Sequence, residues 1–199
     1  AVASYTGKGD LEHLEPALVG ALEAGMTINE INEVLVHSYA YCGFPRSLRA
    51  IQTFMQVVDE RKAKGFDDPV GREATAIDGS CYERGRDVLA EISGVSSDAP
   101  KAGYAVFAPT IERFLKEHLF ADLFERDLLT YRERELATVS ILAGVGGVEP
   151  MAFGHMAICL HLGITDEQLS ALLNIVETNL GKTYSEPLHG VLNQMTENK

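Results

Sequence analysis

The sequence predicts an all-α fold made of a duplicated helical unit, and three observations support this prediction. Apolar residues recur at helical spacing through most of the chain, and no alternating strand pattern exceeds a few positions. Two segments start a helix with the same capping signal. Glycines flank each segment at one common offset, Gly25 and Gly43 in the first and Gly163 and Gly181 in the second. This shared register of caps, stripes and glycines indicates an internal duplication.

The first unit covers residues 1–64. In "GMTINEINEVLVHSYAYCG", Thr27 and Glu30 have the spacing of a capping box. The stripe that follows on one helical face consists of Ile31, Val34, Leu35 and Ser38. At the offset that relates Gly25 to Gly163, Ala1 corresponds to Val139, which lies inside a later helix. We therefore expect the N-terminal half-helix of the first unit to be missing, which leaves an export signal undecided.

Gly, Pro, Asp and Ser mark residues 65–108 as a connector, with a short helix around "CYERGRDVLAEISG". The second unit covers residues 109–199 and opens with "PTIERFLKEHLFADLF". The helical stripe expected there consists of Ile111, Phe114, Leu115, His118 and Leu119. The later capping pairs are Thr130 with Glu133 and Thr165 with Gln168. The second unit is therefore expected to repeat the helices of the first.

Composition restricts the classes of function. The net charge is −12 and no Lys/Arg cluster interrupts it, which argues against a nucleic-acid partner. No apolar run approaches the roughly 18 residues of a membrane span, so no membrane role is expected. Cys42, Cys81 and Cys159 form an odd, widely spaced set without a C-x-x-C pair. This set favours a reducing compartment and a cytoplasmic protein.

Three motifs stand together in this sequence: "RERELATVSILAGVGG", the His-x7-Gly-x-Thr spacing in "HMAICLHLGIT", and "YAYCGFPRSLRAI". Together they resemble the carboxymuconolactone decarboxylase family, which shares the all-helical alkylhydroperoxidase D-like fold. The resemblance implies a tandem-repeat member that assembles as a homo-oligomer, with a trimer favoured. It also implies a small-molecule substrate, a carboxylated lactone or ring compound that is decarboxylated without a cofactor.

The redox members of this family carry C-x-x-C-x-x-x-H on one helix and a glutamate on the preceding helix. On this sequence the histidine falls on His155, and the two cysteine positions fall on Val148 and Met151. Dithiol peroxidase chemistry is therefore not expected, because it needs a reactive thiolate and a resolving partner. In the first unit, Asp10 and His13 occupy the same cysteine positions, and this pair would form a site only if His13 lies beside a cavity.

The resemblance assigns catalysis to His155 as proton donor, with Glu135 holding its tautomer or passing a proton. Arg134 or Arg46 would clamp a substrate carboxylate, and Tyr41 would offer a hydroxyl. Each residue also has a purely structural interpretation. His155 could fill a seam between helices, Arg134 and Glu135 could serve a helix start, and the stretch around Arg46 could form a helix end and turn.

Three hypotheses follow, in this order of preference. The first is a cofactor-free decarboxylase or related enzyme, which predicts a pocket with His155, Glu135 and an arginine. The second is a redox protein with a non-standard cysteine, for which Cys42 is a weak candidate. The third is a non-catalytic oligomeric binding protein. No metal is expected, because the histidines lack ligand spacing.

Overall fold

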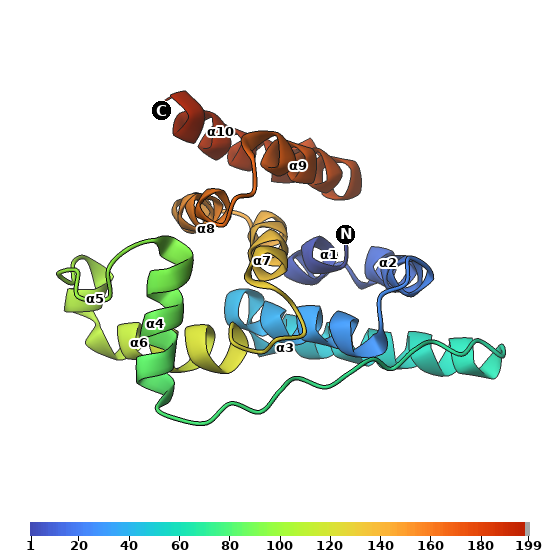
Figure 1. The fold of residues 1–199 in the computed structure, drawn as a ribbon. Helices are drawn as coiled ribbons and strands as arrows, with labels where there is room; N and C mark the ends of the chain where they lie inside the picture. The colour runs from blue at the N-terminus through green and yellow to red at the C-terminus, as the bar shows by residue number, and fades with distance from the viewer. Residues whose placement is uncertain (198–199) are drawn as a thin grey trace.

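A computed structural model describes residues 1–197 and confirms the all-α fold (Figure 1). The helices are α1 (Val2–Lys8), α2 (Leu11–Glu23), α3 (Ile28–Ala63), α4 (Cys81–Ser93), α5 (Tyr104–Phe107), α6 (Pro109–Phe114), a π-helical segment η1 (Leu115–Leu123), α7 (Tyr131–Val145), α8 (Glu149–His161), α9 (Asp166–Leu180) and α10 (Lys182–Glu197). Among these described residues, no helix combines the length and apolarity needed to cross a membrane.

Capping boxes begin three of the helices, as the sequence predicts. Thr27, Thr130 and Thr165 each accept a hydrogen bond from the backbone N–H three residues on, and the side chain there accepts from the threonine N–H in return. Two otherwise unpaired helix-start donors are satisfied in each case. Helices α3, α7 and α9 therefore have starts fixed by local chemistry.

Helix α3 is not one straight rod, because the chain reverses at Gly43. This glycine has φ 78° and ψ 159°, a backbone conformation that other residues rarely adopt. The Ser47 hydroxyl donates to the Leu35 carbonyl oxygen at 2.7 Å, although a straight helix would separate residues 12 apart by about 18 Å. The second half of α3 therefore folds back along the first half (Figure 1).

Corresponding helices of the two units share their bounds at the offset that relates Gly25 to Gly163. Helices α2 and α8 both contain 13 residues and start at Leu11 and Glu149. Helix α9 ends before Gly181 (φ 92°, ψ 164°), just as the first half of α3 ends before Gly43. Helix α10 then follows α9 as the second half of α3 follows the first.

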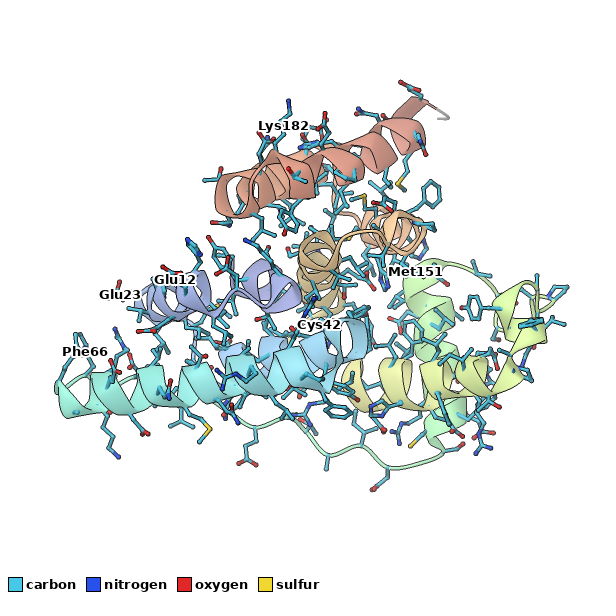
Figure 2. The ribbon with its side chains drawn as sticks, turned by 180° about the vertical axis from the view of Figure 1, so that it is seen from behind. Glu12, Glu23, Cys42, Phe66, Met151 and Lys182 are labelled. Atoms are coloured by element: carbon cyan, nitrogen blue, oxygen red, sulfur yellow. The ribbon has the colours of Figure 1, made fainter. Side chains whose placement is uncertain are left out.

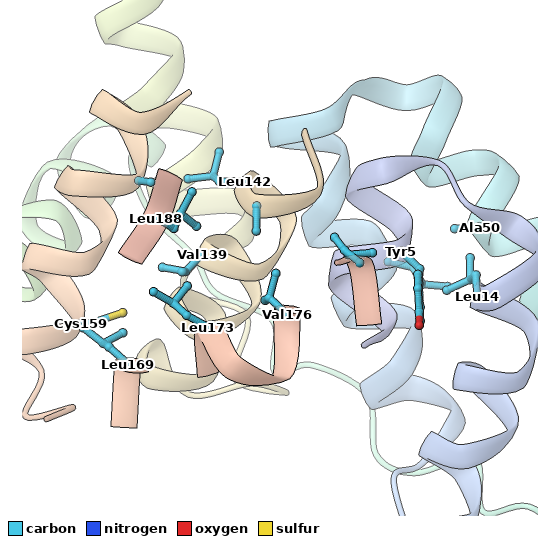
Figure 3. Packing of buried hydrophobic residues seen from close by; sticks show 14 of the residues in the cluster. Tyr5, Leu14, Ala50, Val139, Leu142, Cys159, Leu169, Leu173, Val176 and Leu188 are labelled. Carbon is cyan, nitrogen blue, oxygen red and sulfur yellow. The ribbon is translucent and has the colours of Figure 1, made fainter. Parts of the chain in front are cut away.

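One hydrophobic core joins both units (Figure 3). It combines Tyr5 and Leu14 of the first unit with Val139 and Leu173 of the second. Helices α1 and α7 cross at the centre of this core, where Gly144 lies directly against the α1 backbone. The core therefore depends on helices from both ends of the sequence.

A second, smaller cluster packs α4 against η1, with Ile92 and Phe124 at its centre. The α-helical stripe expected for residues 109–123 is only partly correct. Ile111 and Phe114 are exposed, and the chain from Leu115 onward winds as a π-helix. Helix α4 approaches η1 closely at this segment. A Cβ on Gly85 of α4 would overlap the carbonyl oxygen of Lys116 in η1. Apolar periodicity does not encode such a backbone contact.

We expect Gly144→Ala to lower the free energy of unfolding by about 1–3 kcal/mol, the usual range for overpacking a core. A Cβ at this position would overlap the Ser4 carbonyl oxygen, which is backbone and has no rotamer to change. Urea unfolding measures the effect. Gly154→Ala in α8 is the control, because nothing lies within 4 Å of its Cβ and alanine favours helix. Equal stability of the two variants would contradict the close helix crossing.

Candidate active site

The structure places His155 of α8 against Glu135 of α7. The His155 Nδ1 atom lies 2.7 Å from Glu135 Oε2. The Glu135 side chain is fully buried, whereas 16% of the His155 side chain is exposed. An ionised carboxylate accepts at Nδ1, so this nitrogen carries a proton and Nε2 remains available for chemistry. Fixing one ring nitrogen in this way is how a general acid–base histidine is oriented.

Tyr41 of α3 completes the surroundings of this pair. Its ring meets the His155 ring edge-on, with centroids 5.4 Å apart and an interplanar angle of 78°. The Tyr41 hydroxyl is buried near Thr138 but reaches hydrogen-bond geometry with no described residue. Burial, followed by the negative charge of Glu135, raises the pKa of Tyr41, so its hydroxyl stays protonated. Glu135 Oε1 is likewise buried without a described partner.

Arg134 forms a buried ion pair. Its side chain is fully buried, and Nη2 donates to Glu33 Oε1 at 2.6 Å and to the Arg126 carbonyl oxygen at 2.5 Å. Arg126 also binds Glu33, at 3.0 and 3.1 Å. Arg134 therefore joins α7 to α3, and its Nε atom is buried without a described hydrogen-bond partner.

His37 of α3 contacts both Arg134 and Tyr41. It was not among the predicted site residues. Its Nε2 atom lies 2.8 Å from Thr138 Oγ1, which donates in turn to the Arg134 carbonyl oxygen at 2.9 Å. Its Nδ1 atom lies 3.5 Å from Arg134 Nη1 and must accept from it. The His37 ring also lies 5.2 Å from the Tyr41 ring. A neutral imidazole with its proton on Nε2 satisfies every one of these contacts.

This arrangement predicts a pH effect on stability. Burial and the charge of Arg134 lower the pKa of His37 from 6.5 to about 3. Below pH 6.5 the imidazole of His37 therefore binds a proton in the unfolded chain, whereas in the folded chain it becomes protonated only at about pH 3. The stability contributed by neutral His37 is complete above pH 6.5 and is lost as the pH falls through this window, by at most about 1.4 kcal/mol per pH unit.

His37→Gln keeps polar groups at this position but cannot titrate. We expect its unfolding free energy to fall less steeply than that of the parent between pH 6.5 and pH 4, in urea titrations at several pH values. All other titrating groups are common to the two proteins, so parallel curves would contradict a buried neutral His37.

The other predicted residues contact groups other than His155 and Glu135. Arg46 follows the Gly43 reversal and donates to the carbonyl oxygen of Gly7 in α1. Cys42, labelled with Met151 in Figure 2, donates through its thiol to the Ser38 carbonyl oxygen at 3.1 Å. The structure thus brings together His155, Glu135 and Tyr41, and it brings neither arginine to His155 by a direct contact.

The first-unit pair does not form a site. Asp10 caps α2 and binds the His13 ring at 2.9 Å, but 59% of the His13 side chain is exposed. Lys8 also binds Asp10, at 2.8 Å. The hypothesis of an acid–imidazole site at these positions was wrong, because the pair forms part of a solvated helix start.

The thiols of Cys42 and Cys159 are poorly suited to thiolate chemistry. Burial, followed by the charge of Glu135, raises the pKa of the Cys159 thiol, and burial also raises that of Cys42. A reactive cysteine needs the opposite shift. Within residues 1–197, no three His, Cys, Asp or Glu side chains gather as a metal-binding group. The raised thiol pKa values favour the histidine over the thiols as the reactive group.

The all-α architecture is consistent with the alkylhydroperoxidase D-like fold. Residues 109–183 match the sequence model of the carboxymuconolactone decarboxylase family. The match includes both Glu135 and His155. No curated protein matches the chain.

Proposed function

We propose that this protein is a cofactor-free decarboxylase or a related carboxy-lyase that acts on a small carboxylated lactone or ring compound. The observation that carries the proposal is the 2.7 Å contact between His155 and the fully buried Glu135. The family match over residues 109–183 supports the type of protein. In this proposal His155 is the catalytic acid–base, and Glu135 is its positioning residue.

The proposed reaction needs no external oxidant or reductant. The bond between the substrate carboxylate and the ring breaks, and its electron pair passes into the conjugated lactone carbonyl as CO2 leaves. The resulting enolate carbon takes a proton from His155 Nε2, which then regains one from solvent.

The buried hydroxyl of Tyr41 is the second polar group at this position. It stays protonated and therefore can only donate or accept as a neutral group. We assign it to the substrate side of the site, where a small movement of the ring would expose the hydroxyl to an enolate oxygen. Arg46 remains a candidate for the substrate carboxylate because its side chain is exposed beside the Gly43 reversal.

We also infer that the two units arose by duplication. The equal lengths and common offset of α2 and α8, and the matching glycines after α9 and the first half of α3, support this inference. The position of His155 in the second unit is taken by Ala17 in the first. The proposed chemistry therefore belongs to one unit.

The test is the loss of a carboxymuconolactone, followed by ultraviolet absorbance together with CO2 release. Loss of absorbance with one equivalent of CO2 would support the carboxy-lyase. Loss of absorbance without CO2 would mean lactone hydrolysis or isomerisation by the same pair. No change with this substrate or with a panel of carboxylated lactones and ring acids would remove the decarboxylase proposal and favour a binding protein.

A further inference from the structure

The connector that follows α3 turns back along the start of that helix (Figure 1). The carbonyl oxygens of Pro69 and Val70 accept from the first two backbone N–H groups of α3, at 3.0 and 2.9 Å. Further on, Thr75 donates to both carboxylate oxygens of Asp127, through its backbone N–H and its hydroxyl, each at 2.9 Å. These contacts hold residues 69–75 beside both α3 and the loop that precedes α7.

A pocket of about 230 Å³ lies between these three segments. Its lining includes polar and apolar side chains: Asn32, Glu33 and Val36 from α3, Glu73 from the connector, and Arg126 and Leu128 from the loop before α7. Pockets for drug-sized ligands usually measure about 300–1,000 Å³. This pocket therefore suits a smaller molecule.

Arg126 supplies unused hydrogen-bond donors to this pocket. Its Nε atom donates to both carboxylate oxygens of Glu33, at 3.0 and 3.1 Å, and the buried Arg134 holds Glu33 in turn at 2.6 Å. The two Nη atoms of Arg126 donate to no described residue, and 42% of its side chain is exposed. The guanidinium is therefore held at Nε, while its terminal edge keeps the geometry that binds a carboxylate through two hydrogen bonds.

Two other residues of the lining also have unused polar groups. Neither Asn32 nor Glu73 makes a hydrogen bond or ion pair with a described residue. The Asn32 amide can donate to an acid bound by Arg126, whereas the Glu73 carboxylate can accept from an ammonium group. Glu33 and Glu73 together balance the charges of Arg126 and Arg134. The pocket therefore favours a ligand that carries both signs of charge over a polyanion or a polycation.

We propose that this pocket binds a small α-amino acid, with the ligand carboxylate on Arg126 and the ligand ammonium on Glu73. Val36 and Leu128 provide apolar surface for a side chain of a few carbons. A plain carboxylic acid would leave Glu73 unpaired beside a like charge, and a plain amine would leave the Arg126 donors unused. The proposal is independent of the function proposed above.

The experiment is isothermal titration calorimetry of the full chain with glycine, L-alanine, L-proline and L-valine. At least one of them should bind with a Kd in the millimolar range or below. The same titration is repeated with the acid and the amine that each keep one of the ligand's two charged groups, which for valine are isovalerate and isobutylamine. Both should bind about tenfold more weakly, because each loses one charged hydrogen-bonding group.

Glu73→Gln tests the assignment of the two ends of the ligand. It should weaken binding of the amino acid about tenfold and strengthen binding of the plain acid, because Arg126 is retained and the repelling carboxylate is gone. The exposed Glu73 side chain has no described partner, so the fold should be kept, and circular dichroism checks this. Glu186→Gln is the matched control, because it removes an exposed acid that does not line the pocket.

Arg126→Gln should abolish binding of both the amino acid and the plain acid, while Glu33 keeps its buried partner Arg134. No binding by any of the four amino acids would overturn the proposal. Equal binding by the plain acid would also overturn it, as would an affinity that Glu73→Gln leaves unchanged.

Discussion

His155→Ala is expected to lower kcat/KM by about 10²- to 10⁴-fold once a substrate is in hand, the usual contribution of a positioned general acid–base. The substitution removes the imidazole that Glu135 holds at Nδ1 and whose Nε2 atom is the proposed proton donor. Steady-state rates by ultraviolet absorbance measure the effect. The loss should fall on kcat as well as on kcat/KM, since proton delivery belongs to the transition state.

Glu135→Gln tests whether activity depends on the orientation of His155 by Glu135, because the histidine itself is retained. The amide can still contact Nδ1, but it carries no charge and does not enforce one tautomer, so we expect a smaller loss of about 10- to 100-fold, in the range seen for groups that orient a functional histidine. His118→Ala is the control, because His118 forms a half-exposed pair with Asp122. Parent-like rates for His155→Ala would reject the proposed chemistry.

Arg134→Met is expected to lower the free energy of unfolding by about 3 kcal/mol. The guanidinium is fully buried, and its removal leaves Glu33, which is 2% exposed, with Arg126 as its remaining ion-pair partner. Breaking a buried pair from one side typically costs about 3–5 kcal/mol, and the contact with Arg126 places this case at the lower end. Chemical unfolding monitored by circular dichroism measures the change.

The matched control for Arg134→Met is Arg113→Met, which breaks an exposed pair between Arg113 of α6 and Glu117 of η1. Exposed pairs of this kind contribute only a few tenths of a kcal/mol. If both variants lose the same stability, the buried pair between Arg134 and Glu33 contributes no more to stability than an exposed pair does. If activity survives in Arg134→Met while stability falls, the residue is a structural connection and not a substrate clamp.

Local chemistry explains why the helix starts and the reversal at Gly43 could be read from the sequence. A capping box needs only two residues three apart, and a glycine with positive φ needs no distant partner. The contact between Glu135 and His155 was available only through the family resemblance, because the two residues lie on different helices and meet only when α7 packs against α8. Spacing alone favoured a histidine packed between helices over a catalytic one.

The sequence could not show the group around His37. His37 and Glu33 lie on α3, while their partners Thr138 and Arg134 lie on α7, about 100 positions later. Nothing local distinguishes these two side chains from surface residues of an amphipathic helix. Arg134 was one of two candidates for binding a substrate carboxylate, and its burial depends on how α3 crosses α7, which the sequence does not give. Tertiary packing decides such cases.

The crossing of α1 and α7 also determines how the molecule comes apart. Tyr5 and Leu14 share one core with Val139 and Leu173, so neither unit keeps its own apolar centre when the other melts. Two similar units could have unfolded as two independent steps. Here the calorimetric and van't Hoff enthalpies should agree, as for a single all-or-none transition, even though the sequence predicts the same helical pattern twice.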